Sequence, residues 1–166
     1  MQKVCLVLYD IRSTHNVGSM FRSADGLGAE IVLVGITPRP IGDTNDDRLP
    51  HVSKKAHDAI AKTALGAENT VPWHYFQDSI VALEYLKNRD YYIAALEQDV
   101  SSVTITKHTR SKDIALIVGP EVSGLPDDVL KSVDVIYEIP MIGAKESFNV
   151  SVAAALALYE FRREHI

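Results

Sequence analysis

Short apolar runs alternate along this chain with stretches in which apolar residues recur at helical spacing. Six apolar runs predict β-strands: Val4–Tyr9, Ile31–Gly35, Val71–Phe76, Tyr91–Leu96, Ile114–Val118 and Val135–Ile139. Five other stretches predict helices: Val17–Leu27, Val52–Leu65, Ser79–Lys87, Asp127–Lys131 and Asn149–Arg163. Because strands alternate with helices, we expect an α/β fold with a mostly parallel sheet and helices on both faces.

Two segments stand out from this alternation. The last predicted helix is apolar on nearly all sides from Val150 to Phe161, which predicts burial on more than one side. A second copy of the chain is the expected cover for the outer face, giving a homodimer, and burial within one chain is the alternative. The segment Thr37–Pro50 holds three prolines and a polar run, and is expected to be the least ordered part. It is either a mobile loop over a site or a simple surface connection.

Length and composition bound the class of protein. The chain has 166 residues, 46% of them hydrophobic, which predicts a single domain over residues 1–166 with a buried core. No apolar run reaches the roughly 18 residues of a membrane span, and the N-terminal run ends in Asp10 without a cleavage site. We therefore expect a cytoplasmic protein. The single cysteine, Cys5, lies within the first apolar run and is expected to be a buried, inert thiol.

Charge argues mildly against nucleic acid as a partner, because the net charge is −5. The charge is uneven, however: residues 1–62 carry a balance of +1 and residues 63–166 a balance of −6. A polyanion site should therefore draw on the basic residues of the first third: Arg12, Arg22, Arg39, Arg48, Lys54, Lys55 and Lys62. A solvated mixed surface is the alternative.

The first candidate site follows the first predicted strand. Asn16 is a plausible N-cap of the next helix, and Gly18 and Arg22 are four residues apart, hence on one helical face. A glycine there would leave room for a ligand backbone, and the arginine with free N–H groups would hold a phosphate. A capped helix with a surface arginine is the alternative.

Two further loops follow predicted strands. Gly119-Pro120-Glu121 with Gly124 comes after the continuously apolar run Ile114–Val118 and offers exposed backbone groups. The segment from Ile139 to Asn149 passes through a polar loop into the last helix. Carboxyl ends of parallel strands share one edge of the sheet, so the three loops should converge there on a ligand. Dinucleotide, P-loop, hydrolase and metal-binding motifs are missing from the sequence, and no metal is expected.

Together the three loops resemble the motifs of the SpoU/TrmH family of the SPOUT superfamily, which are RNA 2′-O-ribose methyltransferases. Asn16-x-Gly18-x-x-x-Arg22 resembles the first motif, and Gly119-Pro120-Glu121 with Gly124-Leu125 resembles the second. Ile139-Pro140-Met141 with Gly143 and Ser147–Ser151 resembles the third, with Phe148 where the family usually has leucine. The likeness extends from Asp10 to Arg163, nearly the whole chain.

The resemblance implies a fold, a cofactor and site residues. It implies a deep trefoil knot near the C-terminus, with knot and cofactor site within about residues 113–163, and an obligate homodimer. The implied catalytic residues are Arg22, Asn16, Glu121, Ser147 and Asn149. The residues implied to bind S-adenosylmethionine are Gly119, Ile139, Phe148, Met141, Gly143, Gly124 and Leu125.

The implied reaction is methyl transfer to a ribose 2′-hydroxyl of RNA, with tRNA expected for so small a chain and ribosomal RNA as the alternative. Guanidinium deprotonation is hard, so Arg22 is expected to grip a phosphate and stabilise developing alkoxide charge rather than act as the base. Glu121 is expected to anchor Asn16 or Arg22. Three alternative hypotheses remain: a catalytically silent knotted module that binds RNA or cofactor, a generic nucleotide-binding domain, and an enzyme that methylates a base instead of ribose.

Overall fold

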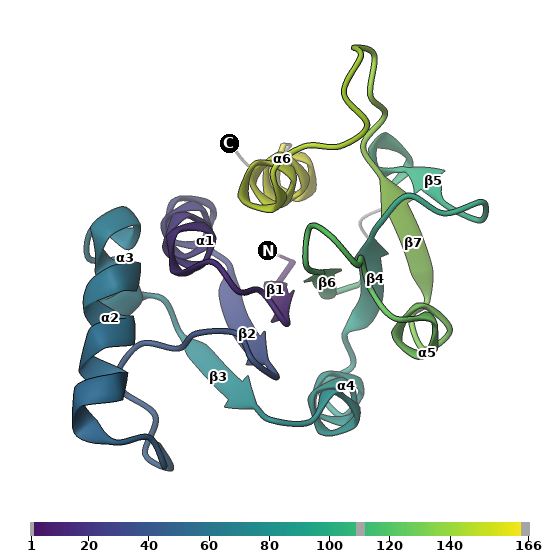
Figure 1. The fold of residues 1–166 in the computed structure, drawn as a ribbon. Coiled ribbons are helices and arrows are strands. Elements are labelled where there is room, and N and C mark those ends of the chain that lie inside the picture. Colours follow the sequence, from purple (N-terminus) through teal and green to yellow (C-terminus); the bar gives the residue numbers. More distant parts are fainter. Residues whose placement is uncertain (1, 109–111, 164–166) are drawn as a thin grey trace.

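A computed structural model describes residues 2–108 and 112–163. In these residues, seven strands form one parallel sheet in the order β3-β2-β1-β6-β4-β7-β5 (Figure 1). The strands are β1 (Val4–Tyr9), β2 (Glu30–Val34), β3 (Trp73–Phe76), β4 (Tyr92–Leu96), β5 (Val103–Thr104), β6 (Ile114–Val118) and β7 (Val135–Glu138). The parallel α/β sheet is therefore confirmed, and the continuously apolar strand β6 is central, between β1 and β4. The knot stays a prediction.

Helices cover both faces of this sheet, as the alternation predicted. They are α1 (Thr14–Leu27), α2 (Pro50–Ala64), α3 (Ala67–Thr70), α4 (Ser79–Lys87), α5 (Asp127–Leu130) and α6 (Val150–Arg162), with a 3₁₀ turn at Ile105–Lys107. Figure 1 shows α1 and α6 over one face and α4 and α5 over the other. Helices α2 and α3 pack against the outer side of α1. Within the described ranges, no helix combines the length and apolar character needed to cross a bilayer.

Alternation along the strands divides the core between the two faces. In β1, Leu6 and Leu8 face the core under α1 and α6, whereas Cys5 and Val7 face the core under α4 and α5. The same alternation in β2 and β6 fills both layers with fully buried aliphatic side chains. Cys5 is buried as expected, and burial raises the pKa of its thiol, which keeps it protonated and unreactive.

The start of α1 differs from the sequence prediction. Ser13, not Asn16, is the N-cap, and its hydroxyl accepts a hydrogen bond from the Asn16 backbone N–H at 3.2 Å. The helix therefore begins earlier, at Thr14, and Asn16 lies inside the first turn with its amide free for other partners.

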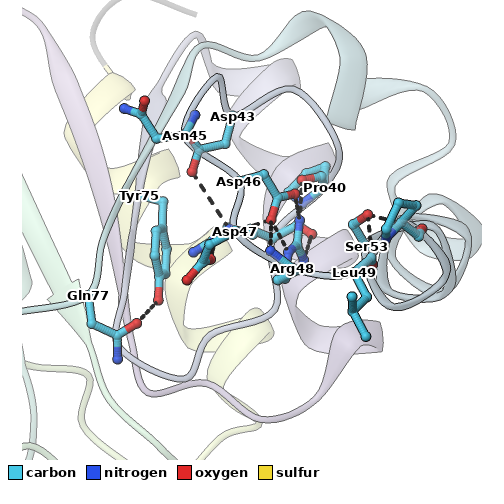
Figure 2. A network of polar contacts seen from close by, with 12 residues as sticks. Pro40, Asp43, Asn45, Asp46, Asp47, Arg48, Leu49, Ser53, Tyr75 and Gln77 are labelled. Atoms are coloured by element: carbon cyan, nitrogen blue, oxygen red, sulfur yellow. Dashed lines mark hydrogen bonds and ion pairs between the residues drawn. The ribbon is translucent and has the colours of Figure 1, made fainter.

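The segment between β2 and α2 is densely bonded, although residues 37–49 form neither helix nor strand. That it is the least ordered part stays a prediction. The buried guanidinium of Arg39 lies 3.7 Å from the Tyr75 ring centroid and forms ion pairs with Asp46 at 3.3 Å and Asp47 at 2.9 Å. Arg48 Nη2 lies 2.6 Å from Asp46 Oδ2. Figure 2 shows this contact of Arg48 with Asp46. Arg39 and Arg48 are therefore both paired with aspartates of this loop. We remove them from the set of basic residues predicted to bind a polyanion.

Candidate cofactor pocket and its catalytic neighbours

A pocket of about 490 Å³ lies at the carboxyl edge of the sheet, over the ends of β4, β6 and β7. Strand order explains its place, because β4 lies between β6 and β7 and all three strands end at this edge. Six of the seven predicted cofactor residues line it: Gly119, Gly124, Leu125, Ile139, Met141 and Phe148. Gly143 lies outside the lining, exposed in the loop between β7 and α6. The pocket has the size of a small-molecule site.

The glycine loop after β6 is held as a tight turn. The Gly124 N–H donates to the Pro120 carbonyl at 3.0 Å, and Gly124 has a φ of +65°, which favours glycine. A Cβ at Gly124 would lie 2.8 Å from Glu97 Oε2, so a side chain there would displace that carboxylate. The turn exposes Glu121, Val122 and Ser123 at the wall of the pocket.

A relay of polar side chains joins the three motifs beside this pocket. The Asn16 Nδ2 donates to Glu121 Oε1, and Asn149 Nδ2 donates to Asn16 Oδ1 at 3.3 Å. Asn149 Oδ1 in turn accepts from the Ser151 N–H at 2.9 Å, and Asn149 is the N-cap of α6. The relay fixes which way the buried Asn16 amide points, with its N–H toward the carboxylate. Three of the five predicted catalytic residues are thereby brought together.

The other two predicted catalytic residues lie apart from this relay. Ser147 is exposed and lines the pocket. Arg22 is exposed on α1 and, rather than lining the pocket, shares a separate surface hollow with Ser19, Ser23 and Lys62. Arg22 and the pocket residues thus line two different hollows of the described chain.

The spacing of Gly18 from Arg22 predicted room for a ligand at Gly18, and this prediction is wrong. A Cβ there would lie 2.3 Å from the Ile60 carbonyl oxygen and 2.2 Å from Thr63 Oγ1. Gly18 is therefore the point where α1 meets the backbone of α2, and its role is helix packing.

Several residues of the pocket could not be predicted from the sequence, because no motif marks them. Glu97 and Gln98 follow β4, where no glycine or motif marks a site, and Glu138 ends β7. With Glu121 and Glu146 they make a lining that, among the described residues, holds four glutamates and no lysine, arginine or histidine. The pocket is therefore strongly acidic and suits a cationic ligand. The described part of the chain shows no His, Cys, Asp and Glu group able to hold a metal ion.

Comparison with known proteins identifies the family. A family model described as the SpoU rRNA Methylase family matches residues 3–159. The chain belongs to the SpoU rRNA methylase family. The resemblance found in the three motifs is thus confirmed.

The relatives of this SpoU family chain include proteins named for ribosomal RNA. It is 32% identical over 160 residues to the 23S rRNA (guanosine-2′-O-)-methyltransferase RlmB of Nitrosomonas europaea, covering 96% of this chain and 56% of that protein. The chain thus spans little more than half the length of that curated relative.

Solved structures share the fold. An AdoMet-bound rRNA methyltransferase from Sinorhizobium meliloti superposes with a TM-score of 0.80 at 24% identity, over 99% of this chain and 57% of that one. A structure concerned with 2-OH methylation of C/U34 on tRNA superposes with a TM-score of 0.75 at 27% identity, over 99% of this chain and 97% of the other.

Proposed function

We propose that this protein is an S-adenosylmethionine-dependent RNA 2′-O-ribose methyltransferase. The observation that carries the proposal is the relay of Asn16, Glu121 and Asn149 beside the acidic pocket, which Glu121 also lines, because it unites all three family motifs at one sheet edge. Relatives named as guanosine-2′-O-methyltransferases support the reaction. A cytoplasmic location is part of the proposal, since RNA substrates are found there.

The pocket fits the proposed cofactor in charge and size. S-adenosylmethionine carries a sulfonium cation that makes its methyl group ready for transfer. Among the described residues, a lining of four glutamates without a basic side chain favours that cation, and about 490 Å³ accommodates a nucleoside with an amino-acid tail. Gly119, Ile139 and Phe148, with the other lining residues of the two loops, would hold it. An AdoMet-bound solved structure with this fold is consistent with that placement.

The side chains around the pocket supply positioning and charge. Asn16, with its N–H held by Glu121, would orient the ribose or its phosphate. Arg22 would grip the adjacent phosphate and stabilise negative charge on the 2′-oxygen, and the phosphate would take the proton. Because a guanidinium stays protonated, Arg22 is not assigned as the base. Ser147, at the pocket, would fix the hydroxyl.

A homodimer would complete this site. Val152, Leu156 and Tyr159 on the outer face of α6 are each about half exposed and border a hollow against α1. Ser19 and Ser23 line both this hollow and the one that holds Arg22. A second copy covering the apolar face of α6 would therefore lie beside Arg22, which would serve the partner's cofactor pocket.

Sharing of the site between subunits can be tested with mixed dimers. One chain would carry Arg22→Ala and the other Asn149→Ala. If Arg22 acts in the partner's site, each mixed dimer retains one intact site, and methyl transfer recovers toward half the wild-type rate. Mixed dimers as inactive as the two parent variants would show that each site uses its own Arg22.

tRNA is the proposed substrate class. The solved structure concerned with C/U34 of tRNA supports it, because the two chains match over nearly their full lengths. Ribosomal RNA is the second candidate, favoured by the RlmB relative, which is named for 23S rRNA.

One experiment tests both the reaction and the RNA. Methyl groups from labelled S-adenosylmethionine would be transferred into total cellular RNA, and the product mapped by nuclease digestion. A 2′-O-methyl nucleotide in tRNA is expected. Label in ribosomal RNA would show that ribosomal RNA, not tRNA, is the substrate. Label on a base would show that the enzyme methylates bases rather than ribose. Cofactor binding without transfer would indicate a catalytically silent module, whereas a protein with neither activity would contradict the proposal.

A further inference from the structure

The dipeptide Glu97-Gln98 occupies a special place in the sheet. It directly follows β4, which lies between β6 and β7, the two strands whose loops form the cofactor pocket. A residue pair at this point lies between the glycine loop after β6 and the loop that joins β7 to α6. Both residues line the pocket.

Glu97 binds the glycine loop through its carboxylate. Its Oε2 accepts the backbone N–H of Leu125 at 3.1 Å, and its Oε1 accepts the N–H of Gln98 at 3.1 Å. Both carboxylate oxygens are therefore engaged by backbone donors. The carboxylate also passes close to Gly124, where a Cβ would lie 2.8 Å from Oε2, so a side chain at that position would force the carboxylate to shift.

Gln98 binds the other loop. Its Nε2 donates to the backbone carbonyl of Glu146 at 2.6 Å, directly before Ser147. The loop from residue 139 to residue 149 carries exposed residues and is outside the helices and strands, so a bond at this point restricts the segment that positions Ser147 and Phe148.

We propose that Glu97 and Gln98 are positioning residues that hold the two cofactor loops in their binding arrangement from the end of one strand. The inference rests on the proposed function for its ligand, S-adenosylmethionine. The pair shapes the free pocket in advance, so that binding does not have to order both loops. Its effect falls on cofactor affinity, since neither residue belongs to the Asn16 relay.

The role assigned to Glu97 is hydrogen-bond acceptance rather than charge. Glu97→Gln keeps an acceptor oxygen at the same reach, whereas Glu97→Ala removes it. Glu97→Ala is expected to weaken S-adenosylmethionine binding about tenfold and Glu97→Gln by less than about twofold. Gln98→Ala is expected to weaken it about threefold, because its bond is exposed. In all three variants the loss should appear as a higher KM for S-adenosylmethionine more than as a lower kcat.

The experiment combines calorimetric titration with S-adenosylmethionine and amide hydrogen exchange of the cofactor-free protein. In Glu97→Ala the Leu125 N–H should lose protection, because its acceptor is gone, and in Glu97→Gln it should keep it. Glu84→Ala, an exposed glutamate change on α4, serves as the matched control and should alter neither quantity.

Three outcomes would overturn the inference. They are wild-type affinity in Glu97→Ala, unchanged exchange of the Leu125 N–H in that variant, and equal losses in Glu97→Gln and Glu97→Ala. The last would assign the effect to charge. If the wild-type protein binds no S-adenosylmethionine, the proposed function fails instead. The exchange measurement then still decides whether the hydrogen bond from the Leu125 N–H to Glu97 holds the glycine loop. Should Glu97→Ala not fold, Glu97→Gln and Gln98→Ala still test the inference through the same two readouts.

Discussion

The side-chain amide of Asn16 donates a hydrogen bond to the carboxylate of Glu121, 105 positions later in the chain. The bond joins the first turn of α1 to the loop after β6, so two motifs that are distant in sequence act as one unit. Because the same amide accepts from Asn149, its orientation is fixed from both ends. This arrangement fits Glu121 as the anchor of Asn16, one of the two partners expected from the sequence.

Separate substitutions should distinguish the relay from the helix cap. Asn16→Ala removes the relay and is expected to lower methyl transfer about a hundredfold with little change in Tm. Ser13→Ala removes the side-chain cap of α1 and is expected to cost about 1 kcal/mol of stability while transfer stays near normal. Transfer assays and thermal unfolding of both variants check this. A large stability loss in Asn16→Ala with normal transfer would return Asn16 to a structural role.

Arg22→Lys tests the phosphate-gripping role. Lysine keeps the charge but loses the planar fork that binds a phosphate through two N–H groups. We expect turnover to fall by at least about tenfold while S-adenosylmethionine binds as in wild type, because Arg22 lies outside the pocket lining. The measurements are turnover and calorimetric affinity. Near-normal turnover would remove Arg22 from the catalytic centre.

Two glycines of α1 provide a matched pair. Gly18→Ala would drive a methyl group into the Ile60 carbonyl of α2 and should destabilise the fold by about 1–3 kcal/mol. Gly26→Ala meets nothing within 4 Å and should stabilise it by about 0.5–1 kcal/mol, because alanine is the better helix former. Denaturant unfolding of both variants measures whether each change raises or lowers the free energy of unfolding. A stable Gly18→Ala would show that the helices can separate at this point.

The sequence predicted the sheet more fully than the site, for physical reasons. Runs such as Ile114–Val118 are long and apolar, so strand formation and burial follow from them alone. Gly18 shows the limit: spacing placed it on one face with Arg22, but only packing decides that this face meets α2. Glu97 was missed because its partner, the Leu125 N–H, is 28 positions away and neither residue has a local signature.

Acid should weaken the loop between β2 and α2. Hydrogen bonds from the Arg48 side chain hold the pKa of Asp46 well below its ordinary value of about 3.9. A group with a lowered folded-state pKa stabilises the fold above its unfolded pKa, and the contribution is lost as pH falls below about 4. Asp46→Asn should therefore cost about 2 kcal/mol at pH 7 and progressively less at lower pH. Unfolding at several pH values, with the exposed Glu84→Gln on α4 as control, checks this, and a pH-independent difference would contradict it.

The negative charge of the pocket should make the protein bind the cofactor more tightly than the product. S-adenosylhomocysteine lacks the sulfonium charge, so the acidic lining should favour S-adenosylmethionine by about threefold or more at low salt. The preference should shrink in Glu138→Gln and in high salt, whereas Glu84→Gln should leave it unchanged. Titrations with both compounds measure it. Equal affinities for the two compounds in the wild-type protein would show that the glutamates do not act on the ligand.

The bonded loop between β2 and α2 also bears on how the protein meets RNA. Arg39 and Arg48 neutralise neighbouring aspartates, and Lys54 pairs with Asp58 at 2.8 Å. Of the basic set in the first third, Arg12, Arg22, Lys55 and Lys62 form no such ion pair among the described residues. RNA that contacted these four would displace only a few condensed counterions per subunit, about three. The logarithm of its affinity would fall with the logarithm of salt concentration at a slope of about −3, shallow enough for shape and base contacts to choose the substrate.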